Sequence, residues 1–132
     1  MTPAEAAALL AVAAAFDNRK PDADAAKAWA VALDDLRFED CRQAVIEHYR
    51  ASTDWLMPAR VRAEVRRIRK ARLDAHPLPP VPVGMTDAAE LTWKRDMRDR
   101  IANGEVFPIP ELPAGAPPAA VKALAAGWRG DR

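Results

Sequence analysis

Apolar residues recur at spacings of three and four positions over most of the first 75 residues, which is typical of helices that bury one face. The chain opens with a capping box, Thr2-Pro3-Ala4-Glu5, with proline at the first helical position. A helix is therefore predicted from Pro3 to Phe16. Residues 17–21 end in proline and close it.

Two further helices follow from the same spacing. Asp22 or Asp24 can cap a second helix, whose apolar stripe consists of Ala26, Trp29, Leu33 and Leu36. A third helix is predicted after Arg37, with acidic residues in its first turn, where they favour the helix dipole. Its stripe consists of Phe38, Cys41, Val45, His48, Tyr49 and Ser52.

The fourth predicted helix follows an interruption at residues 52–55 and starts with Pro58, a residue suited to a first helical turn. Its inward positions are Val61, Val65, Ile68 and either Ala71 or Arg72. No segment alternates with a period of two, so no sheet is expected. The predicted class is all-α, with a compact four-helix domain over residues 1–75.

Proline changes the pattern after the fourth helix. Residues 76–84 hold four prolines in nine positions, which predicts an extended linker over residues 76–85. Residues 86–132 then form a C-terminal arm without a core of its own. Its one substantial helix starts near Thr86 or Asp87 and ends at Asn103-Gly104, followed by a proline-rich tail and a short helix within residues 119–128.

Charge is distributed unevenly, although the formal net charge is only +1. Residues 1–57 hold ten acidic and six basic side chains, whereas residues 58–74 hold seven basic and two acidic ones. Positive charge is thus concentrated on the fourth helix, and a near-neutral total is no argument against a polyanionic partner.

The basic side chains surround the buried stripe of that helix. Arg62 and Arg66, like Arg66 and Lys70, are four positions apart, a spacing at which like charges repel. Arginine also suits bidentate phosphate contacts. Either the helix binds nucleic acid, mainly through phosphates, or the acids of the second and third helices neutralise it. The candidate nucleic-acid-binding residues are Arg60, Arg62, Arg66, Arg67, Arg69 and Lys70.

Residue types that carry catalysis or bind metals are sparse. Cys41 lacks the sequence partners of a nucleophile and is expected to be a buried side chain. His48 is expected in the core or at its boundary and His76 at the surface, and neither has a second metal ligand at the spacing of an HxxxH, CxxC or ExxH motif. We therefore expect no catalytic residues, no metal, no cofactor and no enzyme activity. One cysteine and no membrane-spanning stretch favour a reducing cytoplasm.

The four tryptophans fall into two groups. Trp29 is expected at the centre of the core, supported among others by Phe16, and Trp55 is expected to pack at the start of the fourth helix. Trp93 and Trp128 lie in segments too short for separate cores, which makes them candidate partner-binding residues.

A family resemblance rests on one continuous stretch, "DLRFEDCRQAVIEHYRASTDWLMPARVRAEVRRIRK", preceded by the tryptophan helix. This order resembles small proteins of actinobacterial phages and prophages. It is similar, more loosely, to the N-terminal domain of the phage replicative helicase-loader and inhibitor family over residues 3–73. The resemblance implies a compact helical domain before a flexible tail, and an adaptor that binds a replicative helicase or an initiator protein.

Three functions are consistent with these features. The first is a non-enzymatic accessory protein of phage DNA replication, resembling helicase loaders, that uses the fourth helix for DNA or protein contact. The second is a helix-turn-helix regulator, although the connector before Pro58 is long and the helix offers no Asn or Gln base reader. The third is a structural or assembly adaptor that binds an acidic protein surface.

Overall fold

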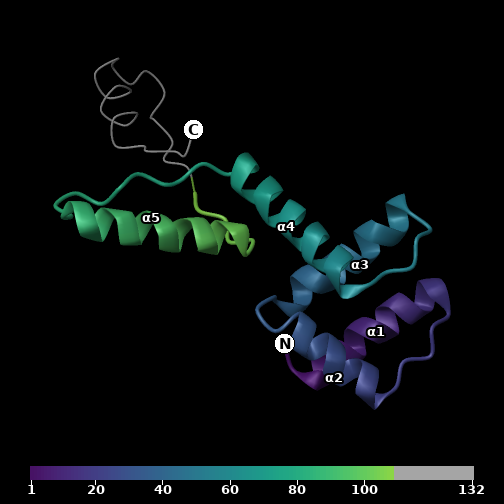
Figure 1. The fold of residues 1–132 in the computed structure, drawn as a ribbon. Coiled ribbons are helices and arrows are strands. Elements are labelled where there is room, and N and C mark those ends of the chain that lie inside the picture. Colours follow the sequence, from purple (N-terminus) through teal and green to yellow (C-terminus); the bar gives the residue numbers. More distant parts are fainter. Residues whose placement is uncertain (109–132) are drawn as a thin grey trace. The chain divides into compact units, whose positions relative to one another are not determined.

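A computed structural model describes residues 1–108, and this part contains five α-helices and no strand. The helices are α1 (Pro3–Asp17), α2 (Ala23–Ala32), α3 (Phe38–Ala51), α4 (Pro58–Ala75) and α5 (Asp87–Ala102) (Figure 1). The predicted all-α class is confirmed for these residues. The short C-terminal helix expected within residues 119–128 lies outside the described residues.

Local capping fixes the helix ends as the sequence predicts. The Thr2 hydroxyl accepts a hydrogen bond from the Glu5 amide, and the Glu5 carboxylate accepts one from the Thr2 amide. Asp22 caps α2 by accepting from the Ala25 amide. Beyond α5, Gly104 adopts φ +96°, a left-handed conformation that glycine takes without strain.

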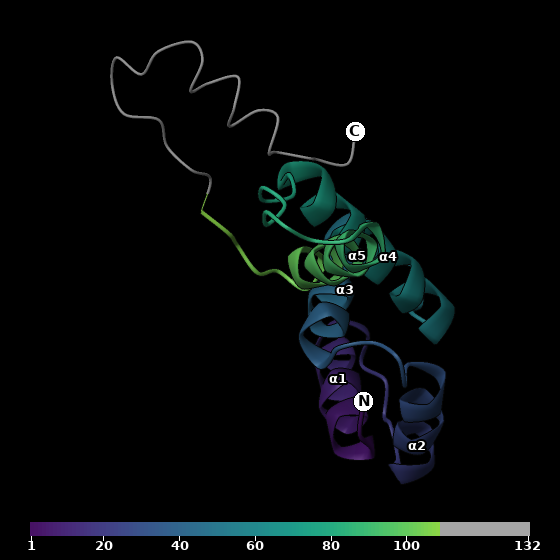
Figure 2. The same cartoon turned by 90° about the vertical axis from the view of Figure 1, so that its left-hand side faces the viewer.

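The chain divides into two compact units, the first from Met1 to Ile68 and the second beginning at Arg69. Within the first unit, α1 packs against both α2 and α3 (Figures 1 and 2). We expected a domain boundary at residue 75, where α4 ends. The first compact unit ends within α4, and beyond it the side chains of Arg69 and Arg72 form hydrogen bonds with the end of α5.

The core of the first unit is built from small and medium-sized side chains of all four helices. Trp29, only 7% exposed, is its largest member, as predicted. The buried positions of α4 are also the predicted ones, namely Val61, Val65 and Ile68. One aromatic expectation is wrong, since Phe16 is 51% exposed. Trp55 is 57% exposed and contacts the Arg19 guanidinium just before α4. Phe16 lies in the last turn of α1 and stacks on the Tyr49 ring instead of entering the core.

The second unit has a small core of its own, which the sequence did not predict. Leu78 from the proline-rich segment is buried with Met97 and Ile101 of α5, and Trp93 and Phe107 pack against them. His76, expected at the surface, connects the proline-rich segment to the residues that follow α5. Its Nε2 accepts a hydrogen bond from the Phe107 amide (3.0 Å), which leaves Nδ1 to donate to the Pro77 carbonyl (2.9 Å).

Trp29→Ala should destabilise the first unit by about 3–5 kcal/mol, because it leaves a large cavity in a core otherwise made mostly of alanine, leucine and valine. Urea unfolding followed by circular dichroism measures the loss. Phe16→Ala is the control, since most of this side chain is already in solvent, and it should cost far less. Equal losses for the two variants would contradict the observed core.

Candidate nucleic-acid interface

The predicted basic cluster lies along α4, one continuous helix of 18 residues. Its buried side faces the first core, so the arginines are distributed over the remaining circumference. Their surroundings differ from one another. The structure separates arginines that hold the fold together from arginines that are directed to solvent.

Arg62 belongs to the first kind. Its Nη1 and Nη2 donate to Oδ1 and Oδ2 of Asp35 at 2.6 and 2.9 Å, and Nη1 also donates to the Ala32 carbonyl. This bidentate pair ties α4 to the segment that follows α2. The hydrogen bonds from Arg62 lower the pKa of Asp35 to about 2. The acids near α2 were one predicted means of neutralising the helix, and for Arg62 that alternative describes the structure.

Arg69 has a comparable role in the second unit. Its guanidinium donates to Asp99 at 2.8 Å and to the side-chain oxygen of Asn103. Arg72, one turn further, donates to the Ala102 carbonyl at the C-terminus of α5 (2.8 Å). A cation at a helix C-terminus satisfies a carbonyl that has no partner within the helix, and it favours the helix dipole.

The four remaining candidates on α4 are solvent-directed. Arg60 and Arg67 share one carboxylate, Glu64, at 3.5 and 3.1 Å, and their side chains are 55% and 59% exposed. Arg66 is exposed, and no ion pair is found for it among residues 1–108. Lys70 pairs with Asp74 on the same helix. The Lys70–Asp74 pair is exposed on both sides and contributes only about 0–1 kcal/mol. The Glu64 side chain is 13% exposed, whereas the two arginines that pair with it extend into solvent, where a phosphate can reach them.

The two partner-binding candidates have different outcomes. Trp93 is half-buried and packs against the second core, beside Leu78 and Met97. Much of its ring is therefore engaged within the chain. Trp128 lies outside the described residues.

A cluster that the sequence did not reveal lies where α1 ends and α4 begins. The Arg19 guanidinium, 8% exposed, pairs with Asp17 at 2.6 Å and donates to the Leu56 carbonyl at 2.8 Å. The Tyr49 hydroxyl donates to Asp17 and accepts from the Leu56 amide. Burial alone would raise the pKa of Asp17, but hydrogen bonds from Arg19 and Tyr49 outweigh it and lower this pKa to about 2.

The same cluster carries two tryptophan contacts. The guanidinium carbon of Arg19 lies 4.3 Å from the centre of the Trp55 ring and 5.3 Å from that of the Trp29 ring. Both distances are within the range of a cation–π interaction. The only local hint in the sequence is the short Asp17-Asn18-Arg19 run at a helix end, which ordinary turn chemistry also explains.

Cys41 and His48 are buried, as predicted. Burial raises the pKa of the Cys41 thiol to about 12. The His48 Nε2 donates to the Asp54 carbonyl at 2.7 Å, which assigns this histidine a structural hydrogen bond. Within residues 1–108 no group of three or more His, Cys, Asp or Glu side chains is placed to hold a metal ion.

A small cavity of about 80 Å³ lies in the second unit, lined by residues that include Leu73, His76 and Arg98. None of the described helices is long and apolar enough to cross a bilayer. No known protein family, curated protein or solved structure matches this chain.

Stability of the first unit should fall in acid as Asp17 takes up a proton. Because its pKa is lower when folded (about 2) than the ordinary value of 3.8, its contribution is complete above about pH 5 and is lost as the pH falls toward 2. The shift corresponds to about 2 kcal/mol. Urea unfolding of wild type and Tyr49→Phe at a series of pH values from 7 to 2 measures it.

Tyr49→Phe removes one hydrogen bond to Asp17 but leaves the Arg19 pair, so the pKa of Asp17 should rise and the acid-dependent loss of stability should shrink. Asp24→Asn, which removes an exposed carboxylate of α2, is the control for a substitution that leaves the contacts of Asp17 intact. A Tyr49→Phe profile that runs parallel to the wild-type profile would contradict this role of the hydroxyl.

Proposed function

We propose that this chain is a non-enzymatic accessory protein of phage DNA replication, which contacts nucleic-acid phosphates through an exposed arginine surface on α4. We define that surface as Arg60, Arg66 and Arg67. The observation that carries the proposal is a local charge imbalance: the three arginines are exposed, and within residues 1–108 Glu64 is the one acid with which they pair.

Two of the six candidate basic residues on α4 already bind acidic side chains from other segments of the chain. Arg62 and Arg69 are committed to Asp35 and Asp99, so moving either to a phosphate would break a tie within the fold. The arginine surface can change partner without such a loss. A guanidinium also presents paired donors that match phosphate oxygens.

The dimensions of the surface suit a short stretch of backbone. Arg60 and Arg67 are seven residues apart on one helix, which corresponds to about 10 Å along its axis. Successive phosphates of one strand are about 3.4 Å apart along a B-form duplex, so the surface covers roughly three nucleotides. Phosphate contacts of this kind position a protein without reading sequence, and weak sequence preference is expected.

A protein partner is part of the proposal, and the resemblance to helicase loaders over residues 3–73 supports it. We propose a replicative helicase or an initiator protein of the host or phage as that partner. The test is co-purification of the tagged full-length chain from lysogenic cells, followed by binding to the purified helicase. Capture of head or tail proteins instead would favour the assembly adaptor, and binding to one operator sequence would favour the regulator.

Replacing Arg60, Arg66 and Arg67 together by glutamine should abolish most nucleic-acid binding while leaving the fold intact. Glutamine keeps the side-chain length and the helix propensity but removes three charges. Three phosphate contacts predict that log K falls with log salt at a slope of about −3 for wild type on duplex DNA, and that this slope nearly vanishes in the variant. Fluorescence anisotropy between roughly 50 and 200 mM salt measures both.

Arg62→Gln is the matched control, since it removes one arginine of the same helix from an internal ion pair. It should lower thermal stability and leave the salt slope unchanged. Absence of duplex binding by wild type at the lowest salt, together with no binding to single strands, would overturn the nucleic-acid proposal.

A further inference from the structure

Trp55 is an exposed aromatic side chain on a firmly held loop. The residues on either side of it are fixed by hydrogen bonds to buried groups: His48 donates to the Asp54 carbonyl, and Leu56 bonds to both Tyr49 and Arg19. Yet the Trp55 side chain remains 57% exposed. The loop thus holds a large aromatic ring at the surface instead of burying it.

One face of the ring is already occupied. The Arg19 guanidinium lies 4.3 Å from the ring centre, and that guanidinium is itself fixed by Asp17 and the Leu56 carbonyl. With this cation in place the Trp55 side chain is still 57% exposed, so ring area remains for a flat partner. Because Arg19 is immobilised, the ring is oriented before any ligand arrives, which reduces the entropic cost of binding.

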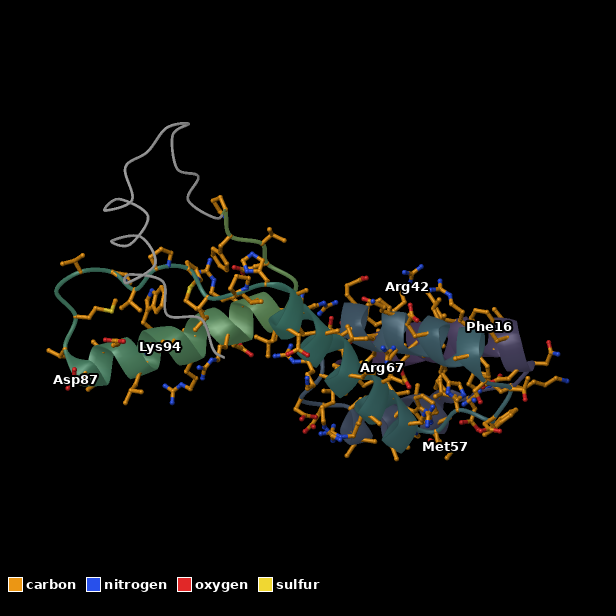
Figure 3. All side chains as sticks on the ribbon, turned by 90° about the horizontal axis from the view of Figure 1, so that it is seen from above. Phe16, Arg42, Met57, Arg67, Asp87 and Lys94 are labelled. Carbon is orange, nitrogen blue, oxygen red and sulfur yellow. The ribbon has the colours of Figure 1, made fainter. Side chains whose placement is uncertain are left out.

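The surroundings of Trp55 suit a nucleobase better than a phosphate. Phe16, in the last turn of α1, and Met57, just before α4, are each more than half exposed (Figure 3). Next to the ring along the chain stands the carboxylate of Asp54, which repels phosphate. The arginine surface begins five residues further on, at Arg60.

We infer that Trp55 is a stacking platform for an unpaired base, and that single-stranded nucleic acid is therefore the ligand of this unit. The inference rests on the proposed function, since the arginine surface would hold the phosphates of the same strand. Aromatic stacking combined with a basic track is the usual arrangement for binding single strands, and the stacking is tolerant of sequence. A duplex keeps its bases stacked inside, so it leaves Trp55 without a partner.

The test compares fluorescently labelled oligo-dT and oligo-U of about 12 nucleotides with a duplex of equal length, using anisotropy and full-length protein. Trp55→Leu removes the ring, and Trp55→Phe keeps a smaller one. Trp55→Leu should weaken binding of both single strands about 5- to 150-fold, the effect of losing one stacked base. Trp55→Phe should recover most of this loss, and neither variant should change duplex binding.

A second readout is the tryptophan fluorescence of the protein. Oligo-dT should quench part of it in wild type, and this quenching should shrink in Trp55→Phe because Trp29 is buried. The variants Trp93→Phe and Trp128→Phe show how much of the quenching comes from the other two tryptophans. Circular dichroism melting checks that both variants fold. Should Trp55→Leu still bind oligo-dT as wild type does, or weaken duplex binding equally, the inference falls.

The two proposals fail in distinguishable ways. Duplex binding that depends on the arginine surface, with no preference for single strands and no effect of Trp55, overturns the stacking platform and keeps the proposed function. Binding of oligo-dT that depends on Trp55 and is insensitive to the triple glutamine variant overturns the arginine surface. Binding of neither nucleic acid overturns both, and would favour a protein surface as the partner.

Discussion

The ion pair between Arg19 and Asp17 is the interaction on which the arrangement of the first unit depends. A guanidinium that is 8% exposed requires nearby acceptors, because an unpaired buried charge costs several kcal/mol. Asp17 supplies the charge, and the Leu56 carbonyl supplies a second acceptor from the loop before α4. The end of α1 is thereby joined to the start of α4, and the direction of the loop between α3 and α4 follows from this contact.

The sequence predicted the helices well because the signals that form them are local. Caps act within three residues and the apolar stripes repeat every three or four, so Thr2, Asp22 and Pro58 could be interpreted without knowledge of the fold. The ion-pair cluster escaped notice because Arg19 and Leu56 are 37 residues apart. The neighbour of Trp55 could not be predicted for the same reason, because it is a cation from a distant turn.

The sequence identifies α4 as the basic helix, but it does not show which of its arginines form ion pairs with other segments. The run of arginines identifies α4, but spacing along a helix says nothing of Asp35 or Asp99, which lie 27 and 30 residues away from their partners. Those two acids decide which arginines are structural. In the second unit, a single proline-rich segment contributes the buried Leu78 and the hydrogen-bonded His76, although its composition predicts an extended linker.

The buried Cys41 thiol can report how often the first unit opens. A thiol that has no exposed surface and whose pKa is about 12 reacts with an alkylating reagent only after the surrounding helices have opened. Since this is the one cysteine of the chain, the rate of its alkylation under native conditions measures how often the core of the first unit opens. The equilibrium between closed and open forms can therefore be followed by mass spectrometry, without any introduced probe.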